Sequence, residues 1–383
     1  MAVYLDHNAT TPLDSRVLDA MMPYLLSSTG NPSSTHSFGR RVREAVEISR
    51  EQVASLINAH PSQVIFTGSG TEANNLAVKG FAELSEVGCS VFSAVEHVSV
   101  IASHQALHKQ GWHSNEIAVD AQGRVSKAAL QEILSTDTKL VSVMWANNET
   151  GVIQDVTGLS ELVRSAGAVM HCDAVQALGK LDINFDGSGV QLMSLSSHKI
   201  YGPQGVGALV RDKSLELEAV LHGGGQEGDL RSGSENIAGI IGFGKAAELA
   251  VKEQHQRSKR CLQLRQRLES QLREIVGISI FSELADRLAN TTFFAVAGIE
   301  GETLLMALDT QGFAVSSGSA CSVADSEASH VLRAMGVDDE LSRCAIRVSI
   351  GKDNSCEDID AFVQCLKQQI SSLQAMTSRA WAV

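Results

Sequence analysis

Between residues 60 and 211, short runs rich in β-branched and aromatic residues alternate with stretches of helical spacing. Most of these runs are almost continuously apolar, which is typical of strands buried on both faces of a sheet. Strands that alternate with helices form βαβ units and a mainly parallel sheet. We therefore expect an α/β fold. The predicted strands cover residues 63–67, 90–95, 139–145, 168–172, 190–195 and 206–210.

The chain after residue 235 follows a different pattern. A long helical stretch is expected over about 236–275, with room for a break inside it. Beyond Gly277, short strand-like and helix-like segments predict a smaller α+β unit, so we place a domain boundary near residues 255–260. The expected segments are a strand over 290–296, a helix over 302–310, a strand over 345–350 and an amphipathic C-terminal helix.

Charge and cysteine content argue against several classes of protein. Lys and Arg number 31 against 44 Asp and Glu, and the net charge of −13 disfavours non-specific binding to nucleic acid or anionic membranes. No run of residues is long and apolar enough for a membrane span, and the N-terminus lacks the features of a signal peptide. The 7 cysteines are irregularly spaced and form no C-x-x-C pair, which argues against disulfides and a zinc site. We expect a cytoplasmic protein without a metal.

Two residues at predicted strand ends suit the chemistry of pyridoxal 5'-phosphate (PLP). Lys199 follows a buried strand in a Ser/His segment, where it either forms a Schiff base with PLP or extends its ammonium to solvent. Asp173 ends another apolar strand, where it either pairs with a pyridinium nitrogen or caps a helix. Gln176 follows closely and could reach the ring hydroxyl of the same cofactor.

A glycine-rich turn at residues 66–75 resembles a phosphate-binding site. There a strand ends, Gly68 and Gly70 allow backbone N–H groups to approach an anion, and Thr71 adds a hydroxyl donor at a helix start. The plainer interpretation is a turn capped by a threonine. The spacing matches neither G-x-G-x-x-G nor the Walker A motif, so a Rossmann dehydrogenase is disfavoured. A second glycine cluster, at 222–234, is a further candidate for a phosphate contact.

Four more residues are candidates for a functional site. His97 follows a strand and either stacks on a flat ring or is a core histidine. Arg347 alternates with apolar residues and is either an ion-pair partner or a clamp for a carboxylate. Asn148 also lies just past a strand. Cys321 lies in a run of small residues, which is typical of an accessible loop rather than a buried thiol.

In this order the motifs resemble those of cysteine desulfurases of the NifS/IscS type, in the class V aminotransferase family of fold-type I PLP enzymes. The resemblance covers nearly the whole chain. The segments that carry it are 4–11, 30–34, 70–72, 96–97, 147–149, 173–176, 198–199, 231–234, 316–321 and 346–347.

The resemblance implies a fold, an activity and partners. A large PLP-binding domain of residues 15–257, with a mainly parallel seven-stranded sheet, would precede a smaller α+β domain of residues 1–14 and 258–383 that carries the cysteine loop. The activity implied is conversion of L-cysteine to L-alanine, with sulfur passed to an iron–sulfur, thio-nucleoside or other acceptor or scaffold protein. A selenocysteine lyase or another class V aminotransferase is the alternative. The resemblance also implies a homodimer.

The residue roles that the resemblance implies divide into cofactor and substrate contacts. Lys199 would bind PLP covalently, Asp173 and Gln176 would contact its ring, and His97 would stack on it and assist proton transfer. Arg347 would bind the carboxylate of L-cysteine near Asn148, and Cys321 would take its sulfur as a persulfide. The residues implied at the phosphate are Gly70, Thr71, Ser196 and His198, with Ser234 reaching the phosphate of the other subunit.

The chain departs from the family pattern at positions near these motifs. Ser197 replaces a usual glycine, and Ser234 replaces a threonine while keeping the hydroxyl. Gly228 and Asp229 stand where an Arg-Gly pair is expected, so an arginine is lost. None of these departures removes a group with an implied catalytic role, and they leave the sulfur acceptor open.

Overall fold

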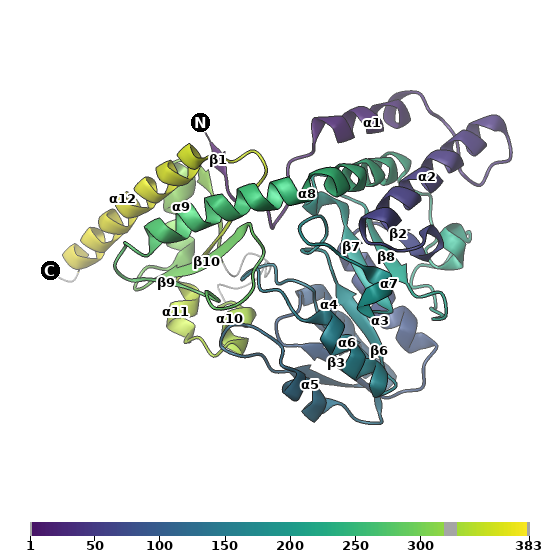
Figure 1. Cartoon of the computed structure of the whole chain (residues 1–383), viewed down its shortest axis with the longest axis horizontal. Coiled ribbons are helices and arrows are strands. Elements are labelled where there is room, and N and C mark those ends of the chain that lie inside the picture. Colours follow the sequence, from purple (N-terminus) through teal and green to yellow (C-terminus); the bar gives the residue numbers. More distant parts are fainter. Residues whose placement is uncertain (1, 318–327, 381–383) are drawn as a thin grey trace.

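The computed structural model describes residues 2–317 and 328–380, and its centre is a seven-stranded sheet with the order β2-β8-β7-β6-β5-β3-β4 (Figure 1). Neighbouring strands are parallel, except that β8 runs antiparallel to both β7 and β2. The predicted α/β fold with a mainly parallel sheet is therefore confirmed. The strands are β2 (Val64–Thr67), β3 (Cys89–Ser93), β4 (His113–Ile117), β5 (Thr138–Ser142), β6 (Val169–Asp173), β7 (Leu192–Ser196) and β8 (Gly207–Arg211).

The strand that the hydrophobic pattern missed is β4, at one edge of the sheet. Its sequence, His-Ser-Asn-Glu-Ile, is largely polar, and mainly its last residue is buried. An edge strand pairs on one side and faces solvent, so it does not need the apolar run that marks a central strand.

Helices cover both faces of this sheet, which is why its central strands are buried over almost their whole length. One face packs on α2, α6 and α8 in the largest apolar core, and the other packs on α3 in a second core. The helices of this unit are α1 (Ser15–Leu26), α2 (Ser37–Leu56), η1 (Pro61–Gln63), α3 (Gly70–Glu83), α4 (Val98–Ala106), η2 (Leu107–Gln110), α5 (Lys127–Ile133), α6 (Val156–Ser165), α7 (Phe185–Ser188), η3 (Ser197–Lys199) and η4 (Gln226–Asp229).

A second, smaller unit is built on a four-stranded antiparallel sheet with the order β12-β13-β10-β9. It has an apolar core of its own, against which α9, α12 and the end of α8 pack. Its elements are β1 (Val3–Tyr4), β9 (Ile278–Ile280), β10 (Thr291–Val296), α9 (Gly301–Thr310), β11 (Phe313–Ala314), β12 (Ser316–Ser317), α10 (His330–Ala334), α11 (Asp339–Arg343), β13 (Ala345–Ser349) and α12 (Cys356–Ala380).

The two units are joined by α8 (Ile237–Leu272), a continuous helix of 36 residues. Figure 1 shows it running from the large sheet to the small one. Phe243 belongs to the core of the large unit, whereas Leu264 and Leu268 belong to the core of the small unit. The break that the sequence allowed within this helix is absent, and the domain boundary at residue 257 stays a prediction.

The N-terminal segment also crosses between the units. Its strand β1 pairs with β11, and Leu5 lies in the small core. The backbone N–H of Thr11 donates to the carbonyl of His198 (2.9 Å), which ties the segment to the end of β7. The segment therefore runs along the junction of the two units. Within residues 2–317 and 328–380, no helix is long and apolar enough to cross a membrane.

Candidate active site

A cavity of about 310 Å³ opens at the carboxyl ends of the central strands. In a parallel sheet these ends meet at one edge, so residues far apart in the sequence come together there. Of the sequence-predicted residues, Gly70, Thr71, His97, Asn148, Asp173, Gln176, Ser196, His198, Lys199 and Arg347 line it.

The start of α3 forms one wall of the cavity. Ser69 caps this helix by accepting a hydrogen bond from the N–H of Glu72 (3.1 Å). A Cβ on Gly70 would lie 2.9 Å from Val175 Cγ2 and 3.4 Å from Ser196 Cβ, so a larger residue would crowd this wall. The first N–H groups of a helix carry partial positive charge, which makes the wall a cradle for an anion such as phosphate.

Asp173 lies at the end of β6, on the floor of the cavity. Its carboxylate accepts hydrogen bonds from Asn74 Nδ2 (2.8 Å) and from the N–H of Val175 (3.0 Å). These two donors hold a buried carboxylate in one orientation, where it can pair with a cationic ring nitrogen. Sequence reasoning gave Asn74 no role, although it follows Gly70 by one helical turn and therefore lies on the same face of α3.

His97 caps α4 directly after β3. Its Nδ1 accepts from the N–H of Ser99 (3.2 Å) and lies 2.7 Å from the Ser99 hydroxyl. Burial lowers the pKa of His97, Lys199 and His330 lower it further, and only Asp173 opposes them. The ring is therefore held neutral with its proton on Nε2, a state suited to stacking and to proton transfer.

The amine of Lys199 is hydrogen-bonded to the N-terminal segment. Its Nζ donates to the backbone carbonyls of Asn8 and Ala9, each at 2.6 Å. The neighbouring His198 is held by Thr10 Oγ1, 3.0 Å from its Nδ1, and burial lowers the pKa of His198 to about 4. The residue beside the lysine therefore adds no positive charge at neutral pH.

Arg347 brings the small unit into the cavity from β13. Its guanidinium pairs with Asp6 (2.6 Å) and donates to the backbone carbonyl of Asn148 (3.1 Å), while its buried Nε has no partner among the described residues. Of the two roles that the sequence allowed for Arg347, the structure shows the ion pair. The guanidinium also lines the cavity, where it can bind a carboxylate.

Two predicted site residues lie outside this constellation. Ser234 is exposed and does not line the cavity. Cys321 falls in 318–327, outside the described residues.

Both flanks of that segment are attached beside the cavity. Ser316 pairs with Arg347 in the small sheet. On the other side, the hydroxyl of Ser329 donates to Glu149 Oε2 (2.5 Å), and His330 Nε2 lies 2.9 Å from the carbonyl of Glu96.

The structure explains one departure from the family pattern. The hydroxyl of Ser197 lies against Gly202, where a Cβ would approach it to 2.0 Å. A serine is therefore accommodated because residue 202 is a glycine. At the other departure, Gly228 and Asp229 have φ of 65° and 66°, and the adjacent Glu227 pairs with Arg50 (2.7 Å).

Comparison with known proteins places the chain in a family. The sequence pattern described as aminotransferase class-V matches residues 3–362. The chain belongs to the class-V aminotransferase family. Among its relatives, the cysteine desulfurase IscS of Anaeromyxobacter sp. (strain Fw109-5) is 43% identical over 98% of this chain and 94% of the relative. The cysteine desulfurase IscS of Dictyoglomus turgidum is 42% identical over 98% of this chain and 96% of the relative.

A solved structure titled NifS-like protein has a TM-score of 0.91 and 36% identity, covering 97% of this chain and all of that one. The predicted family and fold are thereby confirmed. Class-V aminotransferases and cysteine desulfurases are PLP-dependent, and the cofactor prediction is confirmed with them.

The residues of the cavity fit this cofactor of the class-V family. PLP requires an anion cradle, a carboxylate for its ring nitrogen and a primary amine for its aldehyde. The start of α3 at Gly70, the carboxylate of Asp173 and the amine of Lys199 supply these groups in one cavity. The described residues, by contrast, contain no cluster of His, Cys, Asp and Glu able to hold a metal ion.

Proposed function

We propose that this protein is a PLP-dependent cysteine desulfurase that converts L-cysteine to L-alanine and takes the sulfur as a persulfide on Cys321. The observation that carries the proposal is that Lys199, Asp173 and Arg347 line one cavity, beside which both flanks of the cysteine segment are attached. The relatives named as cysteine desulfurases IscS support it over nearly the whole chain.

In this proposal the strand ends hold the cofactor. The start of α3 with Ser196 and His198 receives the phosphate, Asp173 keeps the ring nitrogen protonated, Gln176 faces the ring oxygen, and Lys199 binds the aldehyde carbon. PLP, when bound, supplies an electron sink for carbanion chemistry at the substrate.

The chain's own groups then bind substrate and handle protons. Arg347 binds the carboxylate of L-cysteine, next to Asn148. The amine of Lys199 and the Nε2 of His97 hold and deliver protons at the reacting carbon atoms. The buried position of His97 keeps its ring neutral, and because Nδ1 accepts from Ser99, the proton on Nε2 is the one available for donation.

Transfer of sulfur needs no other oxidant. The C–S bond of the substrate and the S–H bond of Cys321 break, an S–S bond forms to Cys321, and the carbon takes up a proton as alanine forms, so that carbon is reduced while sulfur is oxidised. A thiol on a segment attached near the cavity can accept this sulfur and then present it to an acceptor, for which iron–sulfur and thio-nucleoside pathways are our candidates.

We further propose that the protein acts as a cytoplasmic homodimer. Ser234 is exposed and outside the cavity, which suits a contact with the phosphate in a second subunit. Large apolar side chains are exposed on α1 and α2, and a second copy would cover them. They are Leu18, Met22, Leu25, Leu26, Phe38 and Ile48. A sedimentation measurement that finds the native protein to be a monomer would contradict the dimer.

The test is the measurement of alanine and sulfide released from L-cysteine with PLP and a thiol reductant. Cys321→Ala is expected to abolish both products, whereas Cys356→Ala, which removes an exposed cysteine on α12, retains them. Full release of sulfide by Cys321→Ala would overturn the assignment of the sulfur-accepting residue.

A further inference from the structure

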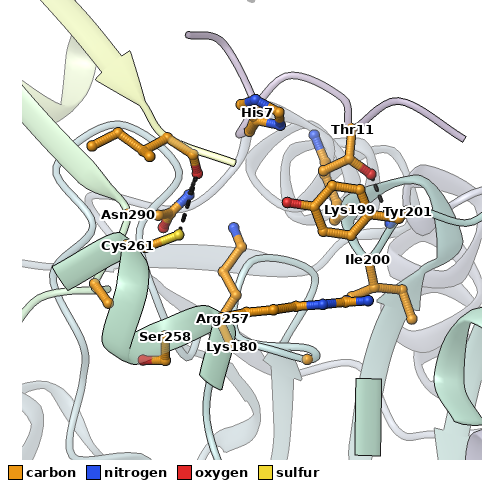
Figure 2. A pocket seen from close by; sticks show the side chains of 13 residues that line it. His7, Thr11, Lys180, Lys199, Ile200, Tyr201, Arg257, Ser258, Cys261 and Asn290 are labelled. Atoms are coloured by element: carbon orange, nitrogen blue, oxygen red, sulfur yellow. Dashed lines mark hydrogen bonds between the residues drawn. The ribbon is translucent and has the colours of Figure 1, made fainter. Parts of the chain in front are cut away.

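A second, smaller cavity lies beside Lys199 and is lined by residues of both units. It has a volume of about 40 Å³, enough for a few water molecules at most. Figure 2 shows Lys180 extending into this space below His7, with Arg257 and Cys261 beside it. Lys180 is partly buried, a charged side chain in such a place is costly unless it is hydrogen-bonded, and none of the steps proposed above uses it.

Lys180 contacts two groups that belong to the cofactor site. Its Nζ donates to Gln176 Oε1 (2.8 Å) and to Asn8 Oδ1 (3.2 Å). The backbone carbonyl of Asn8 also accepts from Gln176 Nε2 (2.9 Å) and from the Nζ of Lys199 (2.6 Å). Asn8 therefore accepts a hydrogen bond from each of the two lysines, Lys180 and Lys199.

Asn8 connects these contacts to the substrate side of the cavity. Its Nδ2 donates to the carbonyl of Asn148 (3.1 Å) and to Thr291 Oγ1 (2.9 Å), and its Oδ1 accepts a second hydrogen bond from Asn290 (3.0 Å). Every donor and acceptor of this side-chain amide is thus used. An amide with all its hydrogen bonds formed is held in one orientation.

We propose that Lys180 is a positioning residue that fixes the orientation of the Gln176 amide. Through Asn8 it also fixes the backbone carbonyl that accepts a hydrogen bond from Lys199. An amine donates hydrogen bonds at both contacts, so the oxygen of Gln176 must face Lys180 and its NH₂ must face away, toward Asn8 and the cavity. This is the orientation in which Gln176 can donate to the ring oxygen of PLP. The inference rests on the proposed function, because the contact of Gln176 with the ring belongs to it.

The two hydrogen bonds of Lys180 do not depend on its protonation state. Burial lowers the pKa of Lys180 to about 7, with Lys199 and Arg347 as further causes, and burial raises the pKa of Cys261 to about 11. Arg257 forms an ion pair with Glu253 (Nη2 to Oε2, 2.6 Å), and its guanidinium lies over the ring of Tyr201. Two hydrogen bonds need only two hydrogens, so Lys180 can hold both partners as an ammonium or as a neutral amine.

The experiment is a double-mutant cycle on the affinity for PLP, measured by titrating the cofactor into the apoprotein. Loss of a positioned charged hydrogen bond predicts that Lys180→Met weakens binding by about tenfold. In a Gln176→Leu background the same substitution is expected to weaken binding by only about threefold, because the contact through Gln176 is already lost and the contact with Asn8 remains. Lys180→Arg, which keeps a donor, is expected to restore most of the affinity.

Equal effects of Lys180→Met in both backgrounds, or a lower Tm with unchanged affinity for PLP, would overturn the inference. Should Lys180→Met fail to fold, Lys180→Gln takes its place in the cycle, because its shorter side chain cannot bridge Asn8 and Gln176. A native chain that fails to bind PLP would overturn the proposed function, whereas normal native binding with an additive cycle would overturn this inference alone.

Discussion

Two sides of the cavity are built in different ways. On the side that we call the strand-end wall, His97, Asp173 and Ser196 each lie at or just past the end of a strand of one sheet, and Gly70 starts the helix that follows another. On the opposite side, which we call the joint, Asn8 and Arg347 come from segments near the two ends of the chain. The wall is positioned by a single sheet and its core, whereas the joint is positioned by hydrogen bonds between the two units.

This difference separates two tasks. A cofactor that stays bound through many reactions needs a rigid site, and buried strand ends supply it. A substrate and a sulfur acceptor must enter and leave, and a junction of two units can yield more easily than a sheet. The wall is therefore the cofactor side and the joint is the substrate side of the proposed enzyme.

The largest effect is expected from a change in the wall. Asp173→Asn keeps the shape of the side chain but removes the negative charge that we propose pairs with the ring nitrogen. Breaking a buried charge pair costs about 3–5 kcal/mol, which predicts a loss of about 10²–10⁴-fold in kcat/KM. Steady-state kinetics on the variant with PLP bound checks this, and a loss below about tenfold would show that the wall does not act through this charge.

The next effect concerns Glu96, which supports the wall from behind. Its Oε1 accepts from Ser93 and from the N–H of Met144 (2.6 Å), and burial raises the pKa of Glu96 to about 8. Because the folded pKa lies above the unfolded value, the neutral carboxyl stabilises the fold fully below about pH 4.5. That contribution is lost as the pH rises toward about 8.

Glu96→Gln mimics the neutral form at every pH. We expect the variant to match the native protein near pH 5 and to exceed its free energy of unfolding by roughly 3 kcal/mol above pH 8. Urea denaturation across this range measures the difference. A native protein whose stability does not fall between these pH values would contradict the assignment of a buried, proton-binding carboxyl.

The smallest effect is expected at Ser329, which contacts Glu149, the residue next to Asn148. Ser329→Ala removes the hydroxyl that donates to Glu149 (2.5 Å) and also caps α10. Loss of one buried hydrogen bond predicts about 1–2 kcal/mol in stability with unchanged affinity for PLP. Thermal denaturation and PLP titration measure the two quantities, and Ser371→Ala, at an exposed site on α12, serves as the control. A weakened affinity for PLP would place Ser329 with the wall.

The wall could be predicted from the sequence because each of its motifs is local. Lys199 and Asp173 each accompany a buried apolar run, and the rule that parallel strands end at one edge brings them together. The family resemblance then supplied their roles. The edge strand β4 escaped prediction because its solvent-facing residues are polar.

Within the joint, Arg347 was among the predicted residues, but the contacts of Asn8 were not. Asn8 is bonded to Asn148, Lys180 and Asn290, and no local pattern near Asn8 indicates partners so far along the chain. Lys180 follows Gln176 by four residues but lies in a turn rather than a regular helix, so the sequence analysis did not pair them. Contacts of this kind become visible only when the two units are placed together.

The division of tasks is tested most directly by measuring the affinity for PLP and the KM for L-cysteine in one variant from each side. Gly70→Ala crowds Val175 in the wall, and Arg347→Gln removes the charge at the joint. We predict that Gly70→Ala weakens PLP binding by about tenfold with a near-native KM once PLP is saturating. Arg347→Gln should raise KM by about 10–100-fold with native affinity for PLP. If both variants lost affinity for PLP and left KM unchanged, the two sides would not divide cofactor from substrate and the account would be wrong.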